Sequence, residues 1–267
     1  MPFVEQGSSR IYYEVAGVGP ALVLIHGAGG GGEGWLSDGY VEAFGSNFTT
    51  VILDISGFGR SRAPSRFEDI SNAGRVQDVE IVLDHLGIEQ TSIFGFSMGG
   101  RIAVAFAMEH PERVSCLVVG SSNPEPAALN LQVAEGRSFL NRCRRLTPRR
   151  AIAAAWRRID RRARRTPPTQ SMLMAQEILD SEEVDAVALS QQFLIDTTRA
   201  AERITMPTLF FQGDRDDVFS AQLSRAFTKR LAHGEFFALR GHGHAILERR
   251  DLVQPIIEPF LLEHGRD

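Results

Sequence analysis

The stretch IFGFSMGGRIA, residues 93–103, places a serine between two glycines, with an apolar run before it and an alanine-rich run after it. The first run predicts a strand and the second a helix, so Ser97 falls on the sharp turn between them. Gly95 and Gly99 remove side chains that would clash where strand and helix cross, and Gly100 lets the helix approach the sheet. Such a turn exposes the serine hydroxyl beside a helix start, whose free N–H groups favour developing negative charge. We therefore interpret Ser97 as a candidate nucleophile.

Strand-like and helical segments alternate on both sides of this turn. Strand-like runs lie at residues 11–15, 21–25, 49–53, 91–95, 115–119, 207–212 and 235–239. Helical patterns lie at residues 72–86, 98–109, 219–232 and 248–263. The first two strands, joined by AGVGP, suggest a hairpin. The later strands are apolar along their length, which predicts an α/β fold with a mostly parallel, doubly wound sheet covered on both faces.

Residues 123–205 break this alternation. They contain several helical stretches, the adjacent prolines Pro167 and Pro168, and no convincing strand. The simplest account is an all-helical insertion between two strands, which would form a cap over the carboxyl edge of the sheet, where ligands bind in such folds. Residues 1–122 and 206–267 would then form the core, in keeping with one large domain of 267 residues.

Composition indicates an ordinary soluble protein. Hydrophobic residues make up 43% of the chain, and no apolar run approaches the roughly 18 residues needed to cross a bilayer. The start MPFVEQGSSR lacks the basic and then apolar pattern of a signal peptide. The two cysteines, Cys116 and Cys143, form neither a disulfide framework nor a metal cluster. We expect a soluble, cytoplasmic protein.

The net charge of −4 hides an uneven distribution. Eleven arginines fall between Arg142 and Arg165, against the single acid Asp160. This segment could bind nucleic acid, anionic lipid or an acidic substrate, or it could form solvated helix faces paired with the acids that follow, between Glu177 and Asp185. We favour the second interpretation because no nucleic-acid motif accompanies the arginines. We therefore expect a small-molecule substrate and neither a nucleic acid nor a membrane as partner; the sequence leaves the oligomeric state open.

Beyond the serine turn, the chain resembles the α/β-hydrolase superfamily over nearly its whole length. LIHGAGG (24–30) resembles the oxyanion-hole loop of that family, and DISGFGRS (54–61) is similar to its D-x-x-G-x-G-x-S turn. The chain order of serine, then an acid after PTLFFQ, then a histidine after EFFAL distinguishes this fold from other folds with a catalytic triad. The resemblance implies an α/β-hydrolase fold and a nucleophilic Ser97. No histidine has a partner at metal-ligand spacing, so we expect neither a metal nor another cofactor.

Two loops offer the remaining triad members. GDRDDVF contains Asp214, Asp216 and Asp217, and the G-x-x-D pattern of the family selects Asp216. RGHGHAIL contains His242 and His244. The family places its histidine in a G-H pair before the final helix, which points to His244, although His242 also follows a glycine.

The resemblance also assigns an oxyanion hole and a binding pocket. The donors would be the backbone N–H groups of Met98 and Ala28, while His26 would serve as a structural hydrogen-bonding residue. Trp35, Phe96 and Phe219 are our candidates for substrate binding. Further apolar residues that could line the pocket, or pack in the core, are Met98, Phe139, Trp156, Met172, Met174 and Phe193.

The substrate class is less defined than the triad. A serine nucleophile argues against haloalkane dehalogenases and epoxide hydrolases, which resemble this chain but use aspartate. HGAGGGGEGW (26–35) resembles the H-G-x-G-x-G-x-x-G-W loop of serine hydrolases that cleave carbon–carbon bonds in ring-opened aromatic compounds. Those enzymes commonly have asparagine and tryptophan where this chain has Phe96 and Ala245.

The elbow G-F-S-M-G-G looks more like that of esterases and enol-lactone hydrolases. We therefore predict a serine carboxylesterase. Carbon–carbon hydrolysis is the second candidate and cofactor-free perhydrolysis the third, because both use the same triad. A ligand-binding receptor that retains the triad is the non-enzymatic alternative.

Overall fold

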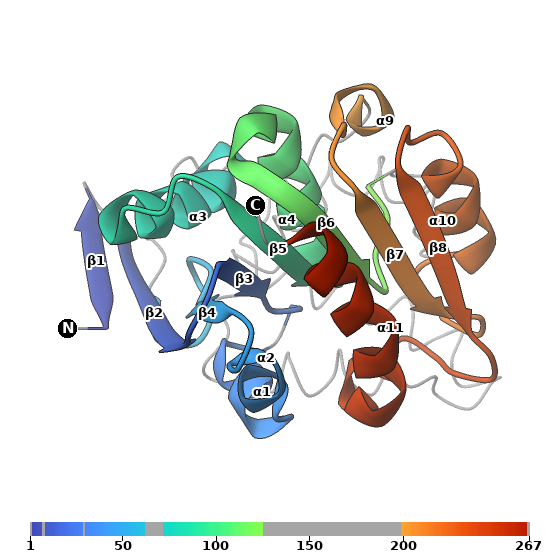
Figure 1. The fold of residues 1–267 in the computed structure, drawn as a ribbon, viewed down its shortest axis with the longest axis horizontal. Coiled ribbons are helices and arrows are strands. Elements are labelled where there is room, and N and C mark those ends of the chain that lie inside the picture. Colours follow the sequence, from blue (N-terminus) through green and yellow to red (C-terminus); the bar gives the residue numbers. More distant parts are fainter. Residues whose placement is uncertain (1, 7–8, 29, 62–71, 125–198, 266–267) are drawn as a thin grey trace, which may run out of the picture.

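The computed structural model describes residues 2–6, 9–28, 30–61, 72–124 and 199–265. Eight strands form one sheet with the order β1-β2-β4-β3-β5-β6-β7-β8 (Figure 1). Their bounds are β1 Phe3–Gln6, β2 Ser9–Gly17, β3 Ala21–Ile25, β4 Thr49–Leu53, β5 Thr91–Phe96, β6 Val114–Gly120, β7 Thr208–Gly213 and β8 Gly234–Leu239. Most of the segment predicted to form a helical cap lies outside the described residues, so the cap and the domain division stay predictions.

The sheet is mostly parallel, as predicted. Every pair from β4 through β3, β5, β6 and β7 to β8 is parallel, whereas β1–β2 and β2–β4 are antiparallel. Parallel strands end at the same edge of a sheet, so the loops after β3, β5, β7 and β8 open at one edge. These loops carry Ala28, Ser97, Asp216, Phe219 and His244 among the candidate active-site residues.

The predicted hairpin between residues 11–15 and 21–25 is wrong. β2 pairs with β4, with Tyr13 opposite Leu53, and β3 lies on the far side of β4. The turn at residues 17–20 therefore carries the chain past β4. This route is tight: Gly17 has φ 89°, and a Cβ there would lie 2.4 Å from the Phe48 carbonyl oxygen. The other neighbour of β2 is β1, a short edge strand that our sequence analysis missed.

Helices cover both faces of the sheet (Figure 1). One face carries α3 (Asn72–Leu86), α4 (Met98–Glu109), α9 (Ala200–Arg203) and α10 (Ala221–Thr228). The other carries α1 (Glu33–Ser37), α2 (Tyr40–Phe44) and α11 (Arg250–His264), the last in front of the sheet in Figure 1. Two short 3-10 turns, η2 (Pro111–Arg113) and η5 (Ile246–Glu248), complete the described helical elements. Our sequence analysis missed α1 and α2.

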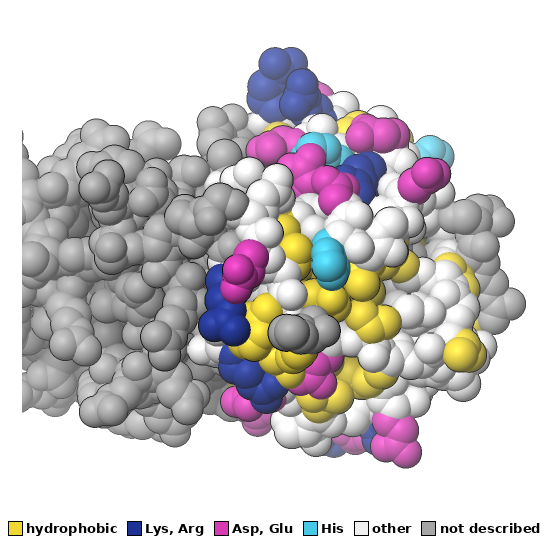
Figure 2. Space-filling model, turned by 90° about the vertical axis from the view of Figure 1, so that its left-hand side faces the viewer, with side chains coloured by type: hydrophobic (Ala, Val, Ile, Leu, Met, Phe, Trp, Pro, Cys, Tyr) yellow, Lys and Arg dark blue, Asp and Glu magenta, His cyan; other side chains and the backbone are white. Residues whose placement is uncertain are grey.

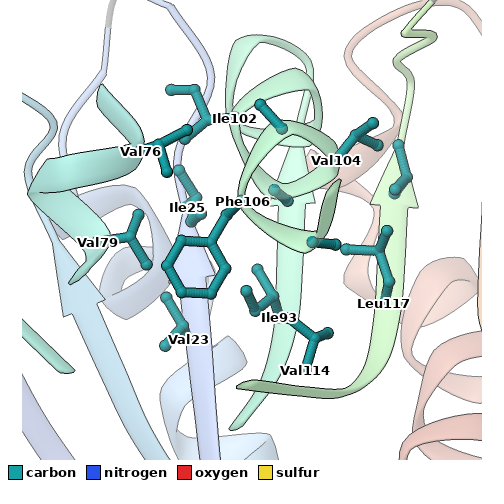
Figure 3. Close-up of a cluster of buried hydrophobic side chains, with 14 of the residues drawn as sticks. Val23, Ile25, Val76, Val79, Ile93, Ile102, Val104, Phe106, Val114 and Leu117 are labelled. Atoms are coloured by element: carbon teal, nitrogen blue, oxygen red, sulfur yellow. The ribbon is translucent and has the colours of Figure 1, made fainter. Parts of the chain in front are cut away.

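Alternating strand residues divide the core into two clusters. Val23 and Ile25 of β3 face α3 and α4, while Leu22 and Leu24 face the opposite helices. Figure 3 shows the first cluster, in which Phe106 of α4 packs among strand and α3 side chains. Because both faces are buried, the central strands are mostly apolar, which is why the sequence predicted them well.

The β1 end of the molecule is less completely covered. Figure 2 views this end and shows hydrophobic side chains gathered on it. Val15 of β2 and Val18 beyond it are exposed. Among the described residues, no helix is long and apolar enough to span a membrane.

Candidate active site

Ser97 lies between β5 and α4 on a strained turn. Its backbone has φ 53° and ψ −113°, a conformation that non-glycine residues rarely adopt and that is concentrated at functional sites. The neighbouring glycines make the turn possible. A Cβ at Gly95 would lie 2.3 Å from the Gly99 carbonyl oxygen, and one at Gly99 would lie 2.2 Å from that of Ile25. The sequence therefore folds here into a tight elbow that presents Ser97 at the carboxyl edge of the sheet.

Ser97, His244 and Asp216 form a continuous hydrogen-bonded chain. The Oγ of Ser97 lies 2.9 Å from His244 Nε2, and His244 Nδ1 lies 3.0 Å from Asp216 Oδ2. An ionised carboxylate only accepts hydrogen bonds, so Nδ1 carries the proton and Nε2 is left to accept the serine hydroxyl. His244 and Asp216 are both buried. This geometry can convert a serine hydroxyl into a nucleophile, with the histidine as base.

Backbone groups fix the acid and its loop. Asp216 Oδ1 also accepts the N–H groups of Val218 and Phe219, at 2.8 and 2.9 Å. The His242 carbonyl accepts the N–H of Arg215 at 2.9 Å, which joins the acid loop to the histidine loop. His242 thus contributes its backbone to this arrangement.

Asp214 has a different hydrogen-bond partner from Asp216. Its Oδ1 accepts the N–H of Gly241 at 2.6 Å, so it ties the loop after β7 to the loop after β8. Among the three acids that the sequence offered, the carboxylate bonded to His244 is that of Asp216.

The loop after β3 runs beside Ser97. A Cβ at Gly27 would lie 3.4 Å from Ser97 Cβ, so Ala28 directly follows a residue in contact range of the serine. Met98, on the other side, is the first residue of α4. The structure therefore brings Gly27, the neighbour of Ala28, beside Ser97, while Met98 follows Ser97 at the start of α4. The oxyanion hole itself stays a prediction.

His26 fixes the start of this loop. Its Nε2 accepts the N–H of Ile55 at 3.1 Å, and its Nδ1 donates to the Gly27 carbonyl at 2.7 Å. Burial lowers the pKa of His26 and keeps the ring neutral, as the acceptor role of Nε2 requires. His26 therefore holds the β3 loop to the β4 loop by hydrogen bonds.

Asp54 is a second anchor of the same loop. Its carboxylate accepts the N–H groups of Gly32 at 2.5 Å and Arg60 at 2.7 Å. A Cβ at Gly31 would lie 2.9 Å from Asp54 Oδ1, and one at Gly59 would lie 2.3 Å from Oδ2. Gly31 of the loop after β3 and Gly59 of the loop after β4 therefore let the backbone close around Asp54. Our sequence analysis quoted the D-x-x-G-x-G-x-S motif without assigning this role to its aspartate.

The three candidate substrate-binding residues occupy two different places. The rings of Phe96 and Phe219 both lie near the His244 imidazole, with centroids 5.6 and 5.9 Å from it. Trp35 packs instead against Tyr40 and Phe94 in the core beneath α1 and α2. The structure thus brings Phe96 and Phe219 to the triad and places Trp35 in core contacts. Phe139, Trp156, Met172, Met174 and Phe193 lie outside the described residues.

A family model described as the alpha/beta hydrolase fold matches residues 20–251. The chain belongs to this family. Comparison with solved structures agrees with the fold: an esterase from Thermogutta terrifontis superposes with a TM-score of 0.74 at 22% identity, covering 96% of this chain and 94% of that one. An enol-lactonase from Burkholderia xenovorans LB400 gives a TM-score of 0.74 at 20% identity, covering 97% and 99%.

One sequence relative of this α/β-hydrolase is described with an activity that differs from those of the esterase and the enol-lactonase. A 2-hydroxy-6-oxononadienedioate/2-hydroxy-6-oxononatrienedioate hydrolase from Burkholderia vietnamiensis is 37% identical over 147 residues, which cover 51% of this chain and 49% of that protein. The chain thus spans about half the length of this curated relative. The similarities establish the family and the fold.

Proposed function

We propose that this α/β-hydrolase is a serine esterase that cleaves small carboxylic esters. The observation that carries the proposal is the hydrogen-bonded chain from Ser97 through His244 to Asp216, with contacts of 2.9 and 3.0 Å. Both contacts are within the range that general-base activation of a serine requires.

Ester hydrolysis proceeds in two steps at this site. His244 Nε2 takes the hydroxyl proton of Ser97 as Oγ attacks the ester carbonyl, and the oxyanion accepts hydrogen bonds from the Met98 and Ala28 amides. The protonated imidazole then gives its proton to the departing alcohol, which leaves an acyl group on Ser97. Water attacks this acyl group with His244 as base, releases the carboxylic acid and restores Ser97. Asp216 holds the imidazole in the required tautomer throughout.

The surroundings of the imidazole favour an ester. The aromatic rings of Phe96 and Phe219 both lie close to the His244 imidazole. In our proposal they offer an acyl chain apolar surface without a further hydrogen-bond donor. The structural similarity to an esterase and an enol-lactonase, although it concerns the fold alone, is compatible with this substrate class.

Carbon–carbon bond hydrolysis is the second candidate, and the relative from Burkholderia vietnamiensis is the observation that favours it. The glycine-rich loop that also suggested this activity has another explanation. Gly31 and Gly32 accommodate the Asp54 carboxylate, so this part of the resemblance has a structural cause that is independent of substrate. We therefore rank ester hydrolysis first.

The test is turnover of p-nitrophenyl esters of increasing chain length by the parent protein and by Ser97→Ala. We expect the parent to turn over the short and medium esters, and Ser97→Ala to lose at least about 10³-fold in kcat, because the covalent route is removed. Circular dichroism and Tm serve as controls for folding. Residual activity within tenfold of the parent, in material free of other esterases, would remove Ser97 from its role.

A further inference from the structure

The strained backbone of Ser97 needs support, because such conformations persist only when their surroundings fix them. The Ser97 N–H donates to the Gly120 carbonyl at 2.8 Å. The Ser97 carbonyl accepts the N–H of Gly100 at 3.1 Å and a side-chain hydroxyl, that of Ser122, at 2.7 Å. Among the described residues, Ser122 provides the only side-chain hydrogen bond to the Ser97 backbone that the structure records.

The end of β6 is shaped to deliver this hydroxyl. Ser121 has φ 41°, and Ser97 and Ser121 are the two described non-glycine residues with positive φ. The Ser121 N–H is fixed to the Phe211 carbonyl at 2.9 Å. The chain therefore bends at Ser121, directly before the buried Ser122 side chain that reaches the nucleophile's carbonyl.

The packing around Ser122 leaves it little freedom. A Cβ at Gly100 would lie 2.7 Å from Ser122 Cβ, so the side chain of Ser122 occupies the space that a larger residue at position 100 would need. Gly100, in the first turn of α4, therefore packs directly against the side chain of Ser122. Ser122 is held against α4 on one side and bonded to Ser97 on the other.

We propose that Ser122 is a positioning residue for the nucleophile, which acts through the Ser97 carbonyl to keep Oγ at its distance from His244. This inference rests on the proposed function of Ser97. Small displacements of a reacting atom are costly, since a shift of about 1 Å can lower a rate by about 10²-fold. Ser122 Oγ donates to the Ser97 carbonyl, so in this proposal it acts through the backbone of Ser97 and takes no part in the proton transfer.

The experiment compares Ser122→Ala with the parent in two measurements of the reactivity of Ser97. The first is the rate at which a fluorophosphonate labels Ser97, and the second is kcat and KM for a p-nitrophenyl ester. We expect Ser122→Ala to lower the labelling rate and kcat by about tenfold, equivalent to one lost hydrogen bond in the reacting geometry, with KM nearly unchanged.

Ser224→Ala is the matched control. Ser224 is buried in α10, and its Oγ accepts a hydrogen bond from Asn123 Nδ2 at 3.1 Å, so the variant loses one buried hydroxyl without touching Ser97. We expect it to lower Tm about as much as Ser122→Ala while labelling at the parent rate. Ser122→Cys is the second variant, for the case that Ser122→Ala does not fold. Its thiol is a weak donor, so we expect labelling several-fold slower than in the parent.

The outcomes separate this inference from the proposed function. If the parent is labelled and Ser122→Ala reacts within twofold of it, or loses no more reactivity than Ser224→Ala, the role of Ser122 is overturned. If Ser122→Ala does not fold and the folded Ser122→Cys variant is labelled at the parent rate, the role of Ser122 is likewise overturned. A parent protein that the fluorophosphonate does not label would overturn the proposed function, and the role of Ser122 with it.

Discussion

His242 and His244 lie two residues apart after β8 but contribute different groups to the site. The ring of His244 contacts Ser97 at 2.9 Å, whereas His242 uses its backbone carbonyl to hold the acid loop. His244→Ala should therefore lower esterase kcat by at least about 10³-fold, and His242→Ala should cost far less. The double variant Ser97→Ala/His244→Ala should be little worse than either single variant, because the residues act as a unit. An inactive His242→Ala with an active His244→Ala would contradict this assignment.

Asp216 receives two backbone N–H groups in addition to the imidazole. Asp216→Asn should keep the loop's shape but place an amide where His244 needs an acceptor. We expect kcat to fall by about 10³- to 10⁴-fold, as measured with the same ester. Asp214→Asn and Asp217→Asn are the matched controls and should stay near parent activity. A larger loss in either control than in Asp216→Asn would assign the acid elsewhere.

At the residue scale, motif positions were predictable and side-chain environments were not. The turn at Ser97 is determined by local glycine spacing, so its conformation follows from the sequence. Trp35 was assigned to the pocket by residue type, yet its contacts with Tyr40 and Phe94 depend on how α1 folds onto the sheet. Ser122 left no sequence signal, because its partner lies 25 residues away and a serine after a strand is common.

At the scale of elements, a buried polar contact joins α3 to the loop after β4. Asp78 of α3 accepts both the N–H and the Oγ–H of Ser56, each at 2.8 Å. Burial raises the pKa of Asp78 from 3.8 to about 7, although the bonds from Ser56 and the charge of Arg75 act in the opposite direction. The contact holds the loop that carries Asp54, and through Asp54 it supports the loop beside Ser97.

This raised pKa predicts how stability depends on pH. Between about pH 4 and 7 the unfolded chain ionises Asp78 while the folded protein keeps it protonated, so this residue's contribution is full below pH 4 and is lost as the pH rises through about 7. The loss is at most about 4 kcal/mol, at 1.4 kcal/mol per pKa unit. Asp78→Asn should abolish this component when urea unfolding is compared at pH 5 and pH 8.

Ser56→Ala provides the opposite change. It removes a hydrogen bond that favours the charged carboxylate, so the loss of stability from pH 5 to pH 8 should become larger than in the parent. A parent protein and an Asp78→Asn variant with identical pH dependence would contradict the raised pKa.

The elements were predictable where burial alone determines them. β3, β5, β6 and β7 are covered on both faces and stand out as largely apolar segments. The neighbour of β2 was not predictable from the sequence. A short connection between two strands is equally compatible with a hairpin and with a crossing over β4 to its far side. The edge strand β1 was missed because only Val4 of its four residues is buried.

At the scale of the whole molecule, the parallel sheet gathers loops that are distant in sequence at one edge. The loops after β3, β5, β7 and β8 supply Ala28, Ser97, Asp216 and His244. The resemblance of the chain order to α/β-hydrolases predicted this convergence, and the shared direction of parallel strands explains it. Substrate choice depends on all the residues around these loops, and the segment predicted to form a cap lies mostly outside the described structure. The hydrogen-bonded chain of Ser97, His244 and Asp216 would serve either candidate function, so a comparison of substrates is what separates them.

That comparison yields the last prediction. Cleavage of a ring-opened dienone acid requires the site to bind a carboxylate and to manage ketonisation of an extended dienol, whereas ester hydrolysis requires only the oxyanion hole and apolar surface. Phe96 and Phe219 supply apolar rings beside His244, and neither side chain can donate or accept a conventional hydrogen bond. We expect kcat/KM for the best p-nitrophenyl ester to exceed that for any dienone acid by at least tenfold, about 1.4 kcal/mol in transition-state binding. Equal or faster cleavage of the dienone would make carbon–carbon hydrolysis the better interpretation, because the site would then stabilise the transition state of that reaction at least as well as that of ester hydrolysis.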